Sequence, residues 1–132
     1  MKKLLVLTLT MILLFSCDPV SDMEATIENL TSENLTIEFI SFDVSSSKVL
    51  KIAPNEIQLF QESFDIGSTF LEPSLVEYDS VVIKNQLKEV LKVYKPNGAN
   101  RNIYNIESYW IASEPSKRFF KYEFVINEED IE

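Results

Sequence analysis

Short runs in which apolar and polar residues alternate recur along the chain, and they constrain its fold more than any other feature. In the last run, large apolar residues at 120, 122, 124 and 126 alternate with Lys121 and Glu123. A period of two predicts a half-buried β-strand, and the continuous apolar side of this one predicts a central strand. The same reasoning predicts strands at Ile27–Leu30, Leu35–Ser41, Val49–Ile52, Ile57–Phe60 and around Tyr109–Ala112.

The segment Ser80–Tyr94 allows two interpretations. Apolar residues at 87, 90, 91 and 94 have the spacing of an amphipathic helix. The β-branched residues at 81–83, 90 and 93 favour strands instead, and the polar residues 84–88 suit a turn. We predict a hairpin of Val81–Lys84 and Glu89–Tyr94, which ends at the turn signal Lys95–Gly98.

Turn signals separate the predicted strands at the spacing that is typical of β-sandwiches. The sequence therefore predicts one all-β, mainly antiparallel, sandwich-like domain over residues 25–132, with an antiparallel meander up to Phe60. Phe64–Glu77 has no clear period, so it is either a functional loop or a crossover that packs its aromatic residues over the core. We favour the crossover. The charged residues 127–130 could form one helical turn.

The first sixteen residues are predicted not to belong to this domain. Lys2 and Lys3 precede the uncharged, mainly apolar run Leu4–Phe15. As a helix this run would measure about 18 Å, which is well short of the ~30 Å hydrocarbon core of a bilayer. The pattern is typical of a cleaved secretory signal.

The next four residues refine this interpretation. Leu14-Phe15-Ser16-Cys17 resembles the lipobox of bacterial lipoproteins, in which the cysteine is lipidated and becomes the mature N-terminus. The resemblance implies a covalent lipid on Cys17, and two or three acyl chains would hold the protein stably on a bilayer. No other cysteine is present to form a disulfide within the chain. Residues 17–24 are then the lipidated cysteine and a flexible acidic tether of about 25 Å.

Composition excludes several classes of function. The chain has no histidine and one cysteine, which excludes Ser-His-Asp and Cys-His catalysis and zinc sites built on His or Cys. Its two glycines cannot form a phosphate-binding loop. Removal of residues 1–16 would change the formal net charge from −9 to −11, and such a body is repelled by nucleic acids. We expect no catalytic residues, no metal and no cofactor besides the lipid.

Five stretches together carry a second resemblance: Leu50–Pro54, Glu77–Val82, Val90–Tyr94, Asn102–Asn105 and Glu114–Lys117. In this order, behind a lipobox, they resemble a group of small lipoproteins of Bacteroidota for which no activity is known. The resemblance implies an outer-membrane or cell-surface location in the cell envelope, because acidic residues near the lipidated cysteine are associated with surface export in that phylum. Asp79-Ser80-Val81 is also similar to that phylum's O-glycosylation acceptor, although a turn that enters a strand explains the same residues and is favoured.

Tyr104, Tyr109 and Trp110 are the candidate ligand-binding residues, because exposed aromatic rings stack on sugars or anchor protein interfaces. For Trp110 we favour a place in the core, with Tyr109 on the opposite face of the strand. The sequence predicts a membrane-anchored, non-catalytic envelope binding or accessory module, with an envelope protein or a glycan as its partner. The alternative is a carbohydrate-binding lipoprotein of a glycan-uptake system, and an acid-pair hydrolase is a distant third.

Overall fold

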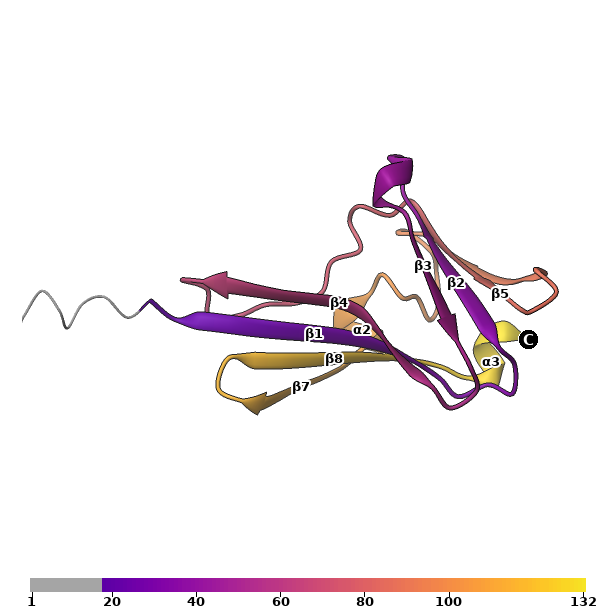
Figure 1. Cartoon of the computed structure of the whole chain (residues 1–132). Coiled ribbons are helices and arrows are strands. Elements are labelled where there is room, and N and C mark those ends of the chain that lie inside the picture. Colours follow the sequence, from indigo (N-terminus) through magenta and orange to yellow (C-terminus); the bar gives the residue numbers. More distant parts are fainter. Residues whose placement is uncertain (1–17) are drawn as a thin grey trace, which may run out of the picture.

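The computed structural model describes residues 18–132, and Cys17 with the predicted signal segment 1–16 lies outside the described residues. Within the described range the chain is mainly β, with two four-stranded sheets (Figure 1). We call β4-β1-β8-β7 the long sheet and β3-β2-β5-β6 the short sheet. The strands are β1 (Val20–Asn29), β2 (Leu35–Ile40), β3 (Lys48–Ile52), β4 (Ile57–Ile66), β5 (Ser80–Lys84), β6 (Val90–Tyr94), β7 (Ile111–Ser116) and β8 (Phe119–Ile126).

Short helical turns connect or end these strands. They are η1 (Val44–Ser46), α2 (Ile106–Tyr109) and α3 (Glu128–Ile131). The helical turn predicted for residues 127–130 is thus confirmed as α3, one residue further on. The predicted hairpin over residues 81–94 is confirmed as well, because β5 and β6 pair antiparallel across the polar turn.

The short sheet is antiparallel, whereas the long sheet is mixed. In the long sheet, β1 pairs antiparallel with β4 and parallel with β8. The predicted meander is wrong, because β1 and β4 pair with each other while β2 and β3, which lie between them in sequence, belong to the short sheet. The two sheets give an arrangement that is consistent with a β-sandwich.

Asn29 marks the point where the chain leaves the long sheet for the short one. Its side-chain amide donates to the carbonyls of Glu33 (2.8 Å) and Ile52 (2.9 Å). Its side-chain oxygen accepts from the Thr31 N–H (2.9 Å) and hydroxyl (2.7 Å). The side chain is fully buried with all of these groups paired, so one residue fixes the crossing between the sheets.

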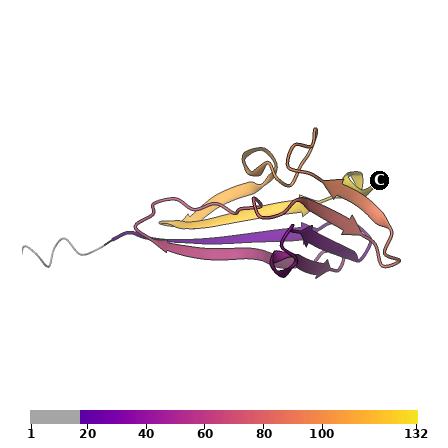
Figure 2. The ribbon, with the colours of Figure 1, turned by 90° about the horizontal axis from the view of Figure 1, so that it is seen from above.

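The long sheet extends well beyond the short sheet. Its strands β1 and β4 each span ten residues, and the end near Val20 projects as an arm (Figures 1 and 2). The predicted flexible tether is therefore corrected, because residues 20–24 belong to β1 and pair with β4, and residues 22–24 pair with β8 as well. Ser21 and Met23 are buried in this arm, and that burial orders a segment whose sequence shows only weak alternation.

The chain between β4 and β5 covers the core side of the arm. The predicted strand at Ile57–Phe60 continues to Ile66, and the chain then returns along the long sheet (Figure 2). The Phe70 ring packs on Phe120 with 5.3 Å between centroids, and the Tyr122 hydroxyl donates to the Leu71 carbonyl at 3.2 Å. The interpretation of this segment as a crossover is confirmed from residue 67 onward, but its start is corrected, because residues 64–66 extend β4 and Phe64 is 70% exposed on the outward side.

The core lies between the sheets and is rich in aromatic side chains. Phe39 of the short sheet stacks on Phe60 of the long sheet with 4.6 Å between centroids. Phe124 of β8 is fully buried, and β8 lies between β1 and β7, so the predicted central strand is confirmed. Burial of side chains of this size contributes about 1.5–3 kcal/mol each to folding.

Two local predictions near the C-terminal region differ from the structure. The strand expected around Tyr109–Ala112 begins only at Ile111, because residues 106–109 form α2. The strand also continues beyond the predicted range, through Pro115 to Ser116. Proline is tolerated there because β7 is an edge strand, where a missing N–H costs no hydrogen bond to a neighbouring strand.

Candidate functional site

The side of the long sheet that faces away from the short sheet has no element of the described residues packed on it. Strand pairing sets which side chains share this side, because paired residues point the same way. Asp22 of β1, for example, is paired with Phe64 of β4 and with Phe119 of β8. We call this surface the open face. It comprises Val20, Asp22, Glu24, Thr26, Glu28, Ile57, Leu59, Glu62, Phe64, Ile66, Ile111, Ser113, Ser116, Phe119, Lys121, Glu123 and Val125.

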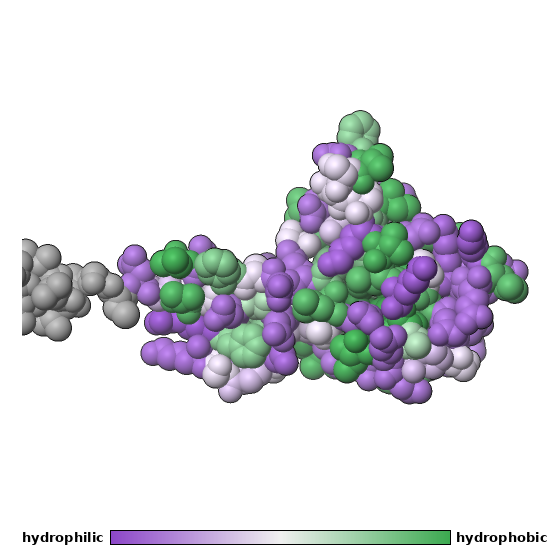
Figure 3. Space-filling model, in the orientation of Figure 1, coloured by the Kyte–Doolittle hydropathy of each residue, from purple (hydrophilic) through white to green (hydrophobic). Residues whose placement is uncertain are grey.

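Large apolar side chains on the open face are exposed. Phe64 is 70% exposed, Ile66 62% and Ile111 61%, and Ile57 and Leu59 are about half exposed. Single exposed apolar residues are ordinary, but a series on one flat sheet face is the pattern of an interaction surface. Figure 3 shows hydrophobic residues among hydrophilic ones over the projecting arm.

Charge is divided unequally between the two sheets. The strands of the long sheet contain seven acidic residues and one basic residue, Lys121. The strands of the short sheet contain one acidic residue, Glu38, and four lysines. A charge that served solubility alone would need no such separation. Among the strand residues, the acidic side chains are thus concentrated on the sheet that carries the open face.

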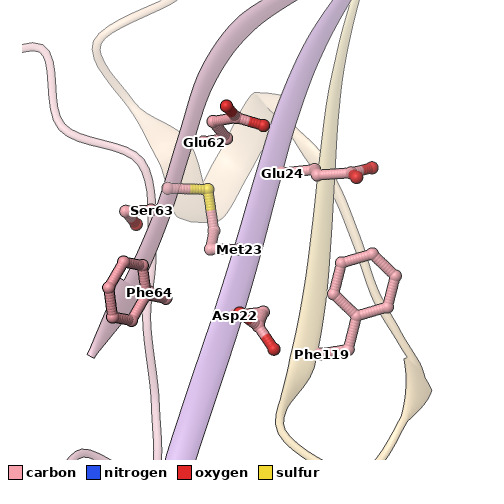
Figure 4. A pocket seen from close by; sticks show the side chains of 7 residues that line it. All are labelled: Asp22, Met23, Glu24, Glu62, Ser63, Phe64 and Phe119. Carbon is pink, nitrogen blue, oxygen red and sulfur yellow. The ribbon is translucent and has the colours of Figure 1, made fainter. Parts of the chain in front are cut away.

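A shallow hollow of about 610 Å³ lies on the arm (Figure 4). The phenyl rings of Phe64 and Phe119 stand on either side of Asp22, because the three residues occupy paired positions on adjacent strands. Glu24 and Glu62 face each other one step further along the same side. The hollow therefore has aromatic walls and a carboxylate floor.

The carboxylates in this hollow are incompletely neutralised. Glu24 and Glu62 are direct cross-strand partners, a like-charge pairing that disfavours the sheet. The Lys121 ammonium lies 3.4 Å from a Glu24 carboxylate oxygen, and its side chain is 48% exposed. Among residues 18–132 no ion pair is formed by Glu62 or Asp22. The hollow retains net negative charge.

A second hollow of about 270 Å³ continues along the open face. It is lined by residues of all four strands of the long sheet, including Thr26, Ile57, Ile111 and Glu123. Glu24 and Lys121 also line it, and Glu24 borders the first hollow as well. The two depressions share a border and run across the sheet rather than forming an enclosed pocket.

The opposite side of the molecule presents different chemistry. On the outer side of the short sheet, the Lys84 ammonium pairs with Glu38 at 2.8 Å. A turn between β2 and β3 projects Phe42, which is 95% exposed, beside Val44. The Ser45 hydroxyl and N–H donate to the Asp43 carboxylate, and these bonds lower the pKa of Asp43.

The three aromatic residues predicted to bind a ligand do not form an exposed platform. Trp110 is buried against Phe60 and Phe124, and its indole N–H donates to the Ile103 carbonyl at 2.8 Å. Its favoured place in the core is therefore confirmed. The Tyr104 hydroxyl donates to the Tyr78 carbonyl at 3.0 Å, and burial raises the pKa of Tyr104 to about 12.

Tyr109 ends α2 instead of lying on a strand, and it is partly buried against the core. The Arg101 guanidinium lies 5.7 Å from its ring centre and also pairs with Asp130 at 3.0 Å. Ser80, the candidate O-glycosylation site, is the first residue of β5 and is 6% exposed. Its environment matches the favoured interpretation of a turn that enters a strand. Cys17 lies outside the described residues.

Sequence reasoning missed the open face for two reasons. Asp22 and Glu24 were assigned to the tether, and Phe64 and Ile66 to a segment without a period. A signal was present, because Ile57, Leu59 and then Glu62, Phe64 and Ile66 form two alternating series that are offset by one residue. The offset coincides with an irregularity in the β1–β4 pairing, between Ala25 and Thr26.

Comparison of the chain with protein-family models, with curated proteins and with solved structures finds no match. Among residues 18–132, no group of three or more His, Cys, Asp or Glu side chains is placed to hold a metal ion. No helix within the same range has the length and apolar character needed to cross a bilayer.

Proposed function

We propose that this protein is a lipid-anchored, non-catalytic binding module of the cell envelope, and that it engages its partner through the open face. The observation that carries the proposal is the series of exposed apolar side chains on that face, concentrated on β4 at Ile57, Leu59, Phe64 and Ile66. Apolar residues rimmed by charged ones are the usual composition of a protein-binding surface. The shallow hollows suit a partner surface better than an enclosed small molecule.

Anchoring by a lipid on Cys17 is supported by the lipobox resemblance, and the start of β1 gives it a geometric consequence. Val20 follows Cys17 by three residues, which span at most about 10 Å. The arm, and with it the first hollow, would thus lie close to the bilayer. An outer-membrane location is proposed on the resemblance to lipoproteins of Bacteroidota.

Carbohydrate binding is a second candidate function, and the same hollow favours it. Phenyl rings can pack on sugar ring faces, and carboxylates accept hydrogen bonds from sugar hydroxyls. Phe64 and Phe119 beside Asp22 supply both groups, in place of Tyr104, Tyr109 and Trp110. Binding on a glycan array that is lost in Phe64→Ala but kept in Tyr109→Ala would support this candidate.

Photo-cross-linking in the native envelope tests the leading proposal. A photoreactive residue at Leu59 or Ile111 samples the open face, and matched positions at Val49 and Val93 sample the outer side of the short sheet. We expect a discrete protein adduct from Leu59 and Ile111 and none from Val49 and Val93. Equal adducts from both sheets, or none from the open face, would contradict the proposed function.

A further inference from the structure

The first hollow, on the arm, contains a cluster of like charges that the fold itself does not require. Three carboxylates, Asp22, Glu24 and Glu62, face one ammonium group, that of Lys121. Cross-strand pairs of like charge destabilise a sheet, so the Glu24–Glu62 pairing has an energetic cost in the isolated molecule. A cation placed in the hollow would remove that cost. The charge on this part of the open face is complementary to a positively charged group.

The aromatic walls specify the kind of cation. Phe64 and Phe119 lie on the strands that flank β1, so their backbones are separated by two interstrand spacings, about 10 Å in total. A guanidinium or ammonium group that sits above Asp22 would lie against both phenyl rings, whose faces attract cations. Arginine fits best, because its planar group can stack on a ring while it donates two hydrogen bonds to one carboxylate.

The surroundings of the hollow indicate that this cation belongs to a polypeptide. The open face continues from the hollow along β4 to Leu59 and Ile57 and across the sheet to Ile111, and these side chains are exposed. A free amine or a small guanidine would leave this apolar surface uncovered. A polypeptide segment with apolar residues beside its arginine would cover it.

We propose that the hollow formed by Asp22, Phe64 and Phe119 receives an arginine or lysine side chain of a partner protein, while apolar residues of the same partner pack on Leu59 and its neighbours. Glu62 and Glu24 supply additional negative charge one step along the groove. This inference rests on the proposed function and adds the chemistry of the partner to it.

The probe for the test is a short synthetic peptide with one arginine between leucine and valine residues, and its matched form has citrulline, the neutral isostere, in place of arginine. Binding to the full-length protein in detergent micelles is followed by amide NMR. We expect the arginine peptide to shift the signals of residues around Asp22, Phe64 and Phe119, and the citrulline peptide to bind about tenfold more weakly. Equal binding of both peptides would overturn the inference.

Variants of the protein provide a second test. Asp22→Asn should weaken binding of the arginine peptide about tenfold, and Phe64→Ala about threefold. Both residues are exposed, so both variants should keep the native amide spectrum. The matched controls are Glu107→Gln, another exposed carboxylate, and Phe42→Ala, another exposed phenylalanine, and neither should change binding. Unchanged binding in Asp22→Asn would overturn the inference.

The cation could also come from a lipid, because phosphatidylethanolamine carries an ammonium group near the place where the arm would lie. Vesicles of phosphatidylethanolamine and phosphatidylcholine distinguish this source. Vesicle binding that depends on Asp22 and Phe64, without peptide binding, would overturn the polypeptide assignment. If cross-links from Leu59 and Ile111 persist while the arginine peptide fails to bind, the proposed function stands and this inference alone falls.

Discussion

At the scale of single residues, the side chain of Asn29 is a structural link between separate segments of the chain. Its fully buried side chain forms four hydrogen bonds, and its backbone carbonyl accepts one more from the Asn55 N–H at 2.7 Å. Asn29→Ala would leave several buried groups unpaired, at about 1–3 kcal/mol each before relaxation. We expect the free energy of unfolding, measured with urea, to fall by about 3–5 kcal/mol.

The control for that change is Asn34→Ala, which removes the same side chain from an exposed position in the same turn. Exposed substitutions usually change stability by no more than about 0.5 kcal/mol. A loss below about 1 kcal/mol for Asn29→Ala would mean that Asn29 does not fix the crossing between the sheets.

Tyr94 shows the opposite situation at the same scale. Its hydroxyl is buried and has no hydrogen-bond partner within residues 18–132, and desolvation by burial raises its pKa. Tyr94→Phe removes a polar group that forms no compensating bond, so stability should stay the same or rise by up to about 1 kcal/mol. Tyr104→Phe, which removes the bond to the Tyr78 carbonyl, should lower it by about 1 kcal/mol. Thermal unfolding of both variants checks the difference in sign.

At the scale of elements, the arm depends on how β4 ends. Gly67 has a φ of +98°, and its N–H donates to the Pro19 carbonyl at 2.6 Å, which joins the end of β4 to the start of β1. A Cβ added at Gly67 would meet no atom within 4 Å, so the cost of Gly67→Ala is confined to the backbone conformation. We expect a loss of about 1 kcal/mol and faster amide hydrogen exchange in the arm.

Thr69→Ala is the control for this prediction, because Thr69 is exposed and follows closely in the same connection. Exchange in the short sheet should be unaffected by either change, since its strands do not pair with β4. Equal exchange in the arm for Gly67→Ala and the native protein would show that Gly67 does not hold the two strands together.

How far the elements could be predicted from the sequence depends on where their stability comes from. The hairpin of β5 and β6 and the central strand β8 carry strong local patterns, and both were found. The order of the strands was not predicted. The parallel pairing of β1 with β8 joins residues about a hundred positions apart, and no local sequence pattern indicates such a pairing. The start of β1 was also missed, since its buried Ser21 contacts a distant part of the chain, donating its hydroxyl to the Ser68 carbonyl at 2.6 Å.

The candidate site also has a part that could be predicted from the sequence and a part that could not. Burial of Trp110 was favoured from the sequence, because tryptophan in a small β-domain usually belongs to the core. The hollow could not be predicted, because Asp22, Phe64 and Phe119 come together only through the pairing of three strands. Residues that share a sheet face across strands share no spacing in the sequence.

At the scale of the whole molecule, buried tyrosines should make the fold sensitive to alkaline pH. Burial raises the pKa of Tyr78, Tyr94, Tyr104 and Tyr122, that of Tyr104 to about 12, while an unfolded chain releases these protons near pH 10. The folded state therefore binds more protons than the unfolded state above that pH. Its stability is fully present below about pH 10 and falls as the pH rises toward 12.

Urea unfolding at several pH values, with tyrosinate absorbance as a second signal, checks this expectation. Tyr104→Phe should flatten the decline between pH 10 and 12, because it removes one of the protons that unfolding releases. An identical pH dependence in the native protein and Tyr104→Phe would show that this hydroxyl titrates equally in both states.

The proposed attachment to a bilayer is the last prediction at this scale, and its test distinguishes a lipid on Cys17 from the protein surface as the cause of attachment. The arm exposes Val20, Phe64 and Ile66, which could contribute a few kcal/mol to membrane contact, but the exposed Asp22 lies on the same side. Acyl chains contribute about 0.8 kcal/mol per CH₂. The lipid should therefore supply more of the free energy of membrane binding than the protein surface does. We expect the native chain in the detergent phase of a phase-separation assay. A chain with residues 1–17 replaced by an ordinary cleavable signal peptide should enter the aqueous phase, whereas retention in detergent would assign the attachment to the arm.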